Sequence, residues 1–279
     1  MAASTHVTAT IMGCGSSGGV PRIGGNWGAC DPSNPKNRRR RCSLLIEGRM
    51  SEAGEPTRIV VDTGCDLREQ LLDAAVDRLD AVLYTHEHAD HTHGIDDLRV
   101  LALNAHRRVD VYFSREAGQR IVQSFAYCFT SPPGSGYPPI LTQNIIAEGQ
   151  MLTISGPGGD IEILPFRQDH GEIFSLGFRI GNFAYSCDLS GIPEQSAAAV
   201  SNLDVWVLDA LRPAPHPSHL SLSEALEQVA LHRPRDAVLT NLHIDLDYAQ
   251  TDKQTPGNVR PAFDGLQVDI TNGTVISPR

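Results

Sequence analysis

Residues 81–97 read AVLYTHEHADHTHGIDD and contain the pattern from which the rest of the chain can be interpreted. The apolar run 81–84 predicts a short buried strand that ends at Thr85, where polar residues begin. Four side chains able to bind metal follow within six residues: His86, His88, Asp90 and His91. The first two histidines are separated by one residue, so in extended chain they point the same way, and a turn can aim the other two at a neighbouring point. This spacing suits two adjacent metal ions better than one.

The types of side chain in this stretch also limit the metal. Imidazole and carboxylate ligands favour Zn²⁺, Mn²⁺ or Fe over Ca²⁺ or Mg²⁺. A histidine-rich loop can bind metal adventitiously, but four potential ligands at the end of one strand predict a built site. His93 lies past the motif and is not counted among the expected ligands.

The pattern His-x-His-x-Asp-His directly after a strand resembles the metallo-β-lactamase superfamily of metal-dependent hydrolases. The resemblance implies an α/β (α+β) fold, namely an αββα sandwich of two mixed β-sheets flanked by helices, with the metal site at one end of the sheets. We therefore expect one metallo-β-lactamase-like domain over residues 1–279, with a long ordered N-terminal loop at 21–41.

Composition limits the class of protein and of partner. With 41% hydrophobic and 20% charged residues, the chain has the balance of a globular domain, and no apolar run approaches the about 20 residues that span a membrane. The N-terminus lacks the pattern of a signal peptide and the six cysteines are scattered, so we expect a cytoplasmic location. A net charge of −10 argues against long nucleic acid as a partner, but not against a small phosphate ester.

Periodicity and turn signals predict the remaining elements. Strands are expected at 7–12, 42–48, 58–64, 109–114, 205–210 and 236–243, and helices at 67–76, 96–105, 115–129 and 221–233. Five short runs at 144–148, 151–155, 161–166, 176–180 and 183–187 predict a second, largely antiparallel sheet. We expect a loop at 131–139 near the entrance of the site, and Ser221 with Glu224 resembles a capping box at the start of the last helix.

The superfamily resemblance implies the remaining metal ligands. It places His170 after a strand of the second sheet and His243 after the last core strand, and it makes Asp188 a bridge between two metals. The residues alone also allow Asp188 to be a helix N-cap. The expected set is His86, His88 and His170 on one metal, Asp90, His91 and His243 on the other, with Asp188 shared. Asp62, near the end of RIVVDTG, is expected to hydrogen-bond a ligating histidine from behind.

His219 precedes a Ser/Glu/Ala helix and is similar to a histidine of the phosphodiesterase branch, which includes RNase Z and PhnP-like proteins. In that branch it supports phosphate binding and protonates the leaving group, so the resemblance implies catalytic roles for Asp90 and His219. GSSGGVP at 15–21, a Trp-Gly-x-Cys segment and an Arg-Arg-x-Cys-Ser strand start resemble the PhnP-like type. RNase Z needs a basic arm to grip transfer RNA, and no long basic insertion is present.

Two parts of the N-terminal region are candidates for contact with an anionic substrate. The glycine-rich stretch 13–20 lacks the phosphate-loop pattern and is about as well explained by a tight turn. The run 38–41 consists of four arginines, which in most proteins form a solvated charge run. The candidate substrate contacts are Ser16, Ser17, Arg22, Arg40 and Arg41.

PhnP itself carries a structural zinc on a cysteine cluster in the N-terminal loop, completed by a histidine just after the last metal ligand. In this chain the loop has only Cys30, and Leu246 stands where the histidine would be needed. One cysteine cannot form a tetrahedral site, so no structural zinc is expected.

Together these features favour a dinuclear phosphodiesterase that hydrolyses a small cyclic or nucleotide-like diester. Two divalent ions, zinc or manganese with iron as a further option, would acidify a shared water. A thioester hydrolase of the glyoxalase II type shares the histidine motif, but His219 and the lack of a helical extension after 245 speak against it. A non-catalytic metal- or nucleotide-binding domain is the alternative from a different class, and a homodimer is left open.

Overall fold

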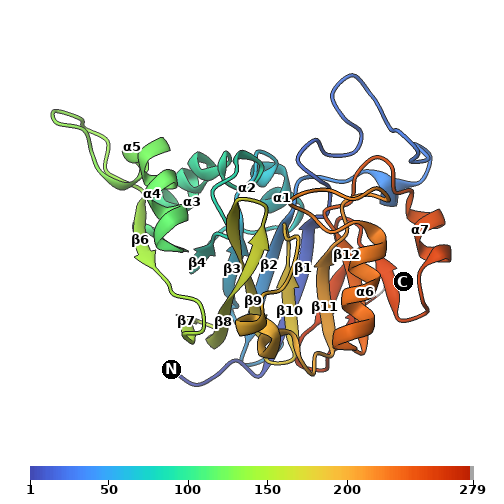
Figure 1. Ribbon diagram of the computed structural model, residues 1–279. Helices are drawn as coiled ribbons and strands as arrows, with labels where there is room; N and C mark the ends of the chain where they lie inside the picture. Colours follow the sequence, from blue (N-terminus) through green and yellow to red (C-terminus); the bar gives the residue numbers. More distant parts are fainter. Residues whose placement is uncertain (277–279) are drawn as a thin grey trace.

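Two β-sheets lie face to face in the middle of the molecule, and helices cover their outer faces (Figure 1). The computed structural model describes residues 1–276. Within these residues one sheet has eight strands and the other seven, and each sheet contains both parallel and antiparallel neighbours. The predicted αββα sandwich is confirmed.

The first sheet carries the histidine motif. Its order is β15-β14-β1-β2-β3-β4-β5-β6. The strands are β1 (His6–Gly13), β2 (Ser43–Arg49), β3 (Thr57–Val61), β4 (Ala81–Leu83), β5 (Val109–Phe113), β6 (Leu141–Ile145), β14 (Gln267–Asp269) and β15 (Thr274–Ile276). From β3 to β6 all neighbours are parallel, so the carboxyl ends of these strands meet at one edge of the sheet.

The second sheet has the order β13-β12-β11-β10-β9-β8-β7. Its strands are β7 (Leu152–Gly156), β8 (Gly159–His170), β9 (Ile173–Ile180), β10 (Phe183–Ser186), β11 (Val205–Asp209), β12 (Asp236–Thr240) and β13 (Val259–Pro261). The neighbours from β7 to β10 are antiparallel and those from β10 to β13 are parallel. This parallel half again gathers several carboxyl ends at one edge.

Helices pack on both outer faces, which explains why the central strands read as continuous apolar runs. In β3, Ile59 and Val61 pack between the sheets, whereas Val60 packs on the opposite face with Leu67 and Leu98 of the covering helices. The helices are α1 (Leu67–Asp73), α2 (Ala89–Thr92), α3 (Leu98–Asn104), α4 (Arg115–Ser124), α5 (Ala126–Phe129), α6 (Leu222–His232) and α7 (Tyr248–Gln254). Short 3-10 turns lie at η1 (Pro35–Asn37), η2 (Ile95–Asp97) and η3 (Glu194–Val200). The predicted capping box is present, because Ser221 and Glu224 bond each other's backbone N–H at the start of α6.

Three predicted elements differ from the structure. The run 144–148 contributes to β6, which pairs in parallel with β5 in the first sheet and not with the second. The strand expected at 161–166 continues to His170, because β9 pairs with it along its whole end. The helix expected at 115–129 is divided at Phe125, whose backbone (φ −123°, ψ 38°) is not helical.

In residues 246–276, where no elements were predicted, the structure has the short helix α7 and then β13, β14 and β15. These strands extend both sheets. Among the helices of residues 1–276, none has the length and apolar character needed to cross a bilayer.

The N-terminal loop packs against the segment that follows β12. Asn37 Nδ2 donates to Asp247 Oδ2 at 2.6 Å, and Asn37 Oδ1 accepts from the backbone of Tyr248 at 2.8 Å. The guanidinium of Arg39, a fully buried side chain, donates to Asn37 Oδ1 and to the backbone oxygen of His243. The loop is therefore tied by polar contacts to the chain that carries an expected metal ligand.

Candidate metal centre

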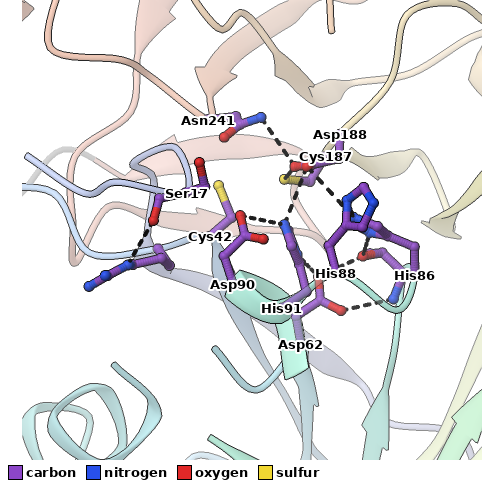
Figure 2. A network of polar contacts seen from close by, with 12 residues as sticks. Ser17, Cys42, Asp62, His86, His88, Asp90, His91, Cys187, Asp188 and Asn241 are labelled. Atoms are coloured by element: carbon purple, nitrogen blue, oxygen red, sulfur yellow. Dashed lines mark hydrogen bonds and ion pairs between the residues drawn. The ribbon is translucent and has the colours of Figure 1, made fainter. Parts of the chain in front are cut away.

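The strand ends of both sheets supply the residues of the site. Asp62 directly follows β3, Asp188 lies just beyond β10, and Asn241 directly follows β12. All three have positive φ angles, of 63°, 56° and 60°. Asp and Asn adopt this left-handed conformation more readily than other non-glycine residues. The bends bring the side chains of Asp188 and Asn241 together beside the histidine motif (Figure 2).

Three imidazoles and one carboxylate form the first group of ligand atoms. The group consists of His86, His88, His170 and Asp188, whose ligand atoms all lie within 4.8 Å of one another. His88 Nδ1 lies 2.9 Å from His86 Nε2 and 3.3 Å from His170 Nε2. The extension of β8 carries His170 from the second sheet to the motif of the first sheet. The structure thus brings together the residues that the resemblance assigned to one metal.

The orientation of the rings fits a divalent ion. His170 Nδ1 lies 2.7 Å from the backbone oxygen of Ser218, which can only accept, so this nitrogen carries the hydrogen and Nε2 keeps a free lone pair. His86 Nδ1 lies 2.9 Å from Thr85 Oγ1, whose own hydrogen is donated to Asp62. Outer partners of this kind fix the tautomer of ligating histidines. The inward nitrogens are therefore free to bind metal.

A second group forms around His91. Its Nε2 lies 3.4 Å from both Asp90 Oδ2 and Asp188 Oδ2, and its Nδ1 lies 2.8 Å from Asp62 Oδ2. Asp62 also accepts from the backbone and side chain of Thr85, so one buried carboxylate holds the frame of both groups. Asp188 belongs to both groups.

His243 lies beyond the end of β12 and approaches from the far wall. Its Nδ1 is 2.8 Å from Asp245 Oδ2, and its Nε2 contacts the guanidinium of Arg22. Among residues 1–276 the tight group around His91 contains Cys187 and Asp188, while Asp90 and His243 line the pocket next to it. The structure gathers all seven expected ligands in this region, with His243 the most loosely placed.

A pocket of about 180 Å³ includes the carboxylates of the site. Its lining combines expected ligands, candidate substrate contacts and the segment around His219: Ser16, Ser17, Arg22, Asp90, Asp188, Leu211, Arg212, His216, His219, Asn241 and His243. Among the described residues, none of 131–139 lines this pocket, although a loop at 131–139 was expected near the entrance of the site.

Arg40 and Arg41 lie outside this pocket. Arg40 forms ion pairs with Asp73 at 2.8 Å and Asp264 at 3.1 Å, and Arg41 pairs with Asp66 at 3.1 Å. Their charges are therefore compensated within the protein, whereas Ser16, Ser17 and Arg22 lie where a substrate could meet them.

Comparisons with known proteins bear on the family. A sequence model described as Beta-lactamase superfamily domain matches residues 57–244. The chain belongs to this superfamily. A crystal structure described as a new diphosphatase from the PhnP family matches with a TM-score of 0.83 and 30% identity, over 94% of this chain and 97% of that one. The PhnP-like resemblance predicted from the sequence is thereby confirmed, and the chain is a metal-dependent hydrolase of the metallo-β-lactamase fold.

Two further proteins are similar to this chain, one in structure and one in sequence. Human tRNase Z, short form, matches with a TM-score of 0.62 and 17% identity, over 94% of this chain and 99% of that one. An octanoyltransferase of Porphyromonas gingivalis (strain ATCC BAA-308 / W83) is 30% identical over 270 residues, which are 93% of this chain and 51% of that protein. The chain spans about half the length of this curated relative.

Charge in the metal centre of this superfamily member is divided between neutral rings and ionised carboxylates. Burial lowers the pKa of His170 to about 4 and that of His86 well below its usual value. Burial opposes the ionisation of Asp188, but the neighbouring His91 holds the pKa of this carboxyl well below its ordinary range. Near neutral pH the rings of His86 and His170 are therefore uncharged, and Asp188 is a carboxylate.

His219 is held by a buried aspartate that the sequence analysis did not single out. His219 Nδ1 lies 2.8 Å from Asp209 Oδ2, and His219 Nε2 lies 3.8 Å from Asp188 Oδ2. Burial raises the pKa of Asp209 to about 6. Burial also disfavours the protonated ring of His219, but the hydrogen bond to Asp209 outweighs this effect and raises its pKa. His219 can therefore hold a proton and direct Nε2 into the pocket.

Four more residues of the site were missed at the sequence level. Arg212 and His216 line the pocket. Cys187 and Asn241 donate hydrogen bonds to Asp188. Only Asp209 had a usable signal, because it ends an apolar strand in the same way as Asp62.

Proposed function

We propose that this hydrolase cleaves a small phosphodiester, with two divalent ions, zinc or manganese, held by the seven residues named above. One observation carries the proposal: the same small pocket contains the metal-competent carboxylates, a histidine backed by a buried aspartate, and two arginines that face its interior. Metal ions in such a pair would polarise the phosphoryl group and acidify a water.

Protonation of the leaving group is the proposed role of His219. An alkoxide leaves poorly without a proton, and an imidazole near neutral pH is a suitable donor. Its Nδ1 is occupied by Asp209, so only Nε2 can deliver a proton to a bound ester. Asp90 holds the second ion in this scheme and orients the attacking water.

Binding of the phosphoryl oxygens is the proposed role of Arg22 and Arg212. Arg212 donates to the backbone oxygens of Ala214 and Pro215, and Arg22 contacts His243. Neither arginine forms an ion pair with a carboxylate of residues 1–276, in contrast to Arg40 and Arg41. Uncompensated guanidinium groups in a polar pocket favour an anionic ligand.

The size of the pocket and the charge of the chain support a small substrate. About 180 Å³ accommodates a phosphate ester and part of its leaving group, and the net charge of −10 disfavours a long nucleic acid. The similarity to a diphosphatase of the PhnP family supports a cyclic or nucleotide-like ester, with a diphosphate as a related substrate.

Hydrolysis of bis(p-nitrophenyl) phosphate by metal-stripped protein tests the proposal. Turnover should return when Zn²⁺ or Mn²⁺ is added, and it should fall by about 10²–10⁴ in His219→Ala while the metal content stays the same. Arg115→Ala, on the outer helix α4, serves as a matched surface control. Absence of diester turnover with either metal, together with cleavage of an acyl thioester, would replace this proposal by the thioester hydrolase.

A further inference from the structure

The two carboxylate oxygens of Asp188 have different surroundings (Figure 2). Oδ1 accepts hydrogen bonds from Cys187 Sγ at 2.9 Å and from Asn241 Nδ2 at 3.1 Å. Oδ2 instead faces imidazoles, and its distances to four Nε2 atoms are 3.4–3.9 Å: those of His91, His86, His219 and His170. Protein donors therefore hydrogen-bond Oδ1, whereas Oδ2 lies nearest to the ring nitrogens.

Buried hydrogen bonds hold the backbone of Cys187 and Asp188 beside Oδ1. The backbone oxygen of Cys187 accepts from Gln168 Nε2 at 3.3 Å, and the backbone oxygen of Asp188 accepts from Ser175 Oγ at 2.7 Å. Gln168 and Ser175 are fully buried, and Asn241 is 2% exposed. The donors come from two different strand ends, after β10 and after β12, so they reach the carboxylate from independent parts of the sheet.

We propose that Cys187 and Asn241 are positioning residues for the metal pair, which hold Asp188 Oδ1 so that Asp188 offers the ions a single oxygen, Oδ2. A carboxylate fixed in this way cannot turn to bind one ion with both oxygens, and its free oxygen stays between the two ligand groups. Cys187 acts here as a thiol donor. The inference rests on the two-metal site of the proposed function, but not on which ester is hydrolysed.

The rival role for Cys187 is direct ligation, because its sulfur lies within 4.8 Å of the ligand atoms of His91 and Asp188. Its hydrogen bond argues for the donor role. The thiol is hydrogen-bonded to Oδ1 and not to Oδ2, the oxygen that faces the ring nitrogens. A sulfur that bound an ion beside Oδ2 would have to give up this hydrogen bond.

The absorption spectrum of the Co²⁺-loaded protein separates these two roles of Cys187. A thiolate bound to Co²⁺ produces an intense ligand-to-metal charge-transfer band in the near ultraviolet. We expect no such band. A band that is present in the wild type and lost in Cys187→Ser would show that the sulfur is a ligand and overturn the proposal.

Zinc affinity, measured by competition with a chromophoric chelator, tests the two donors. Cys187→Ala and Asn241→Leu should each weaken binding about 10–100-fold, the usual cost of losing a partner of a metal ligand, whereas Cys187→Ser, which keeps a donor, should stay within about threefold of the wild type. Cys14→Ala removes an equally buried sulfur that faces Asp264 and is the matched control.

Two results would contradict the positioning role. Unchanged zinc affinity in both Cys187→Ala and Asn241→Leu would mean that Oδ1 needs no donor, and equal weakening in the serine and alanine variants would mean that hydrogen bonding is not what Cys187 supplies. The diesterase assay and the metal content of the wild type report separately on the proposed function, so failure of one does not imply failure of the other.

Discussion

The metal centre and the contact between the N-terminal loop and the chain after β12 are both polar and buried, but their polar atoms are used differently. At the loop, donors and acceptors meet one another: Asn37 bonds Asp247 and Tyr248, and Asp247 also accepts from the backbone of Asp31. At the metal centre, the inward Nε2 atoms of His86 and His170 keep free lone pairs, because the hydrogen of each ring lies on Nδ1. A polar cluster that satisfies itself holds a fold together, whereas one that converges on free lone pairs requires a ligand.

The N-terminal loop is also tied through Cys30 to the chain that follows β12. The sulfur of Cys30 donates to the backbone oxygens of Ile244 and Leu246, and the buried guanidinium of Arg39 lies 3.9 Å from it. Hydrogen bonds of this kind cross-link the loop to the chain after β12.

Removal of metal should have the largest effect, because it should change the metal centre and leave the contact of the N-terminal loop unchanged. A chelator should abolish hydrolysis and lower the melting temperature, because ions bound at 100 times their Kd add about 2.7 kcal/mol each to the stability of the native state. The loop contact is built from hydrogen bonds between protein groups and should keep its protection from hydrogen exchange. Loss of protection at Asn37 and Tyr248 together with the metal would contradict the separation.

Asp209→Asn should have the next largest effect on turnover. The amide of asparagine carries no negative charge, so its hydrogen bond with His219 Nδ1 is weaker. The ring therefore loses its fixed orientation and its raised pKa. We expect kcat to fall on the order of 10²-fold, with an altered pH–rate profile and unchanged metal content. A changed KM with normal kcat would instead indicate a role in binding.

Asn37→Ala should damage the loop and spare the chemistry. It leaves Asp247 and the backbone N–H of Tyr248 without a buried partner, which should cost about 2–3 kcal/mol in the free energy of unfolding. Urea denaturation measures this cost. Asn104→Ala, at an exposed position of α3, is the matched control and should change stability by less than about 0.5 kcal/mol.

Arg212→Ala and Arg40→Ala should differ in kind. Loss of a guanidinium that binds the substrate should raise KM about tenfold, equivalent to 1.4 kcal/mol. Arg40 is paired with Asp264, a carboxylate whose side chain is only 12% exposed, so its removal should lower stability with little change in KM. Steady-state kinetics and melting temperatures of both variants test this distinction, and a raised KM in Arg40→Ala would return that residue to the substrate site.

The pH dependence of the loop contact should be a smaller but clear effect. Burial opposes the ionisation of Asp247, but hydrogen bonds from the backbone of Asp31 and Gln250 and from Asn37 lower its pKa. Because the pKa of Asp247 is lower in the folded protein, the carboxylate stabilises the fold at pH values above its unfolded pKa of about 3.9. This stabilisation is lost as the pH falls through the folded pKa. The difference in melting temperature between wild type and Asp247→Asn should therefore shrink below about pH 4. A constant difference would contradict this assignment.

The part of the site that could be predicted from the sequence consists of residues in short local motifs. The motif from His86 to His91 needs only one strand end, and the resemblance extends the ligand set to His170, Asp188 and His243. Arg212, His216 and Asn241 could not be found in this way, because their roles arise where the two sheets meet. The same reason explains β6, whose position is set by its partner β5 and not by its own sequence.

The bends at Asp62, Asp188 and Asn241 limit how this site can be changed or copied. A left-handed backbone costs most side chains about 1–2 kcal/mol per residue, so these positions select short side chains before any metal chemistry is considered. Lengthening Asp188 to glutamate would strain the backbone as well as displace the oxygen. A designer who grafts the ligands onto another scaffold must therefore graft the three bends with them, or the carboxylates will point along the strands instead of across the gap.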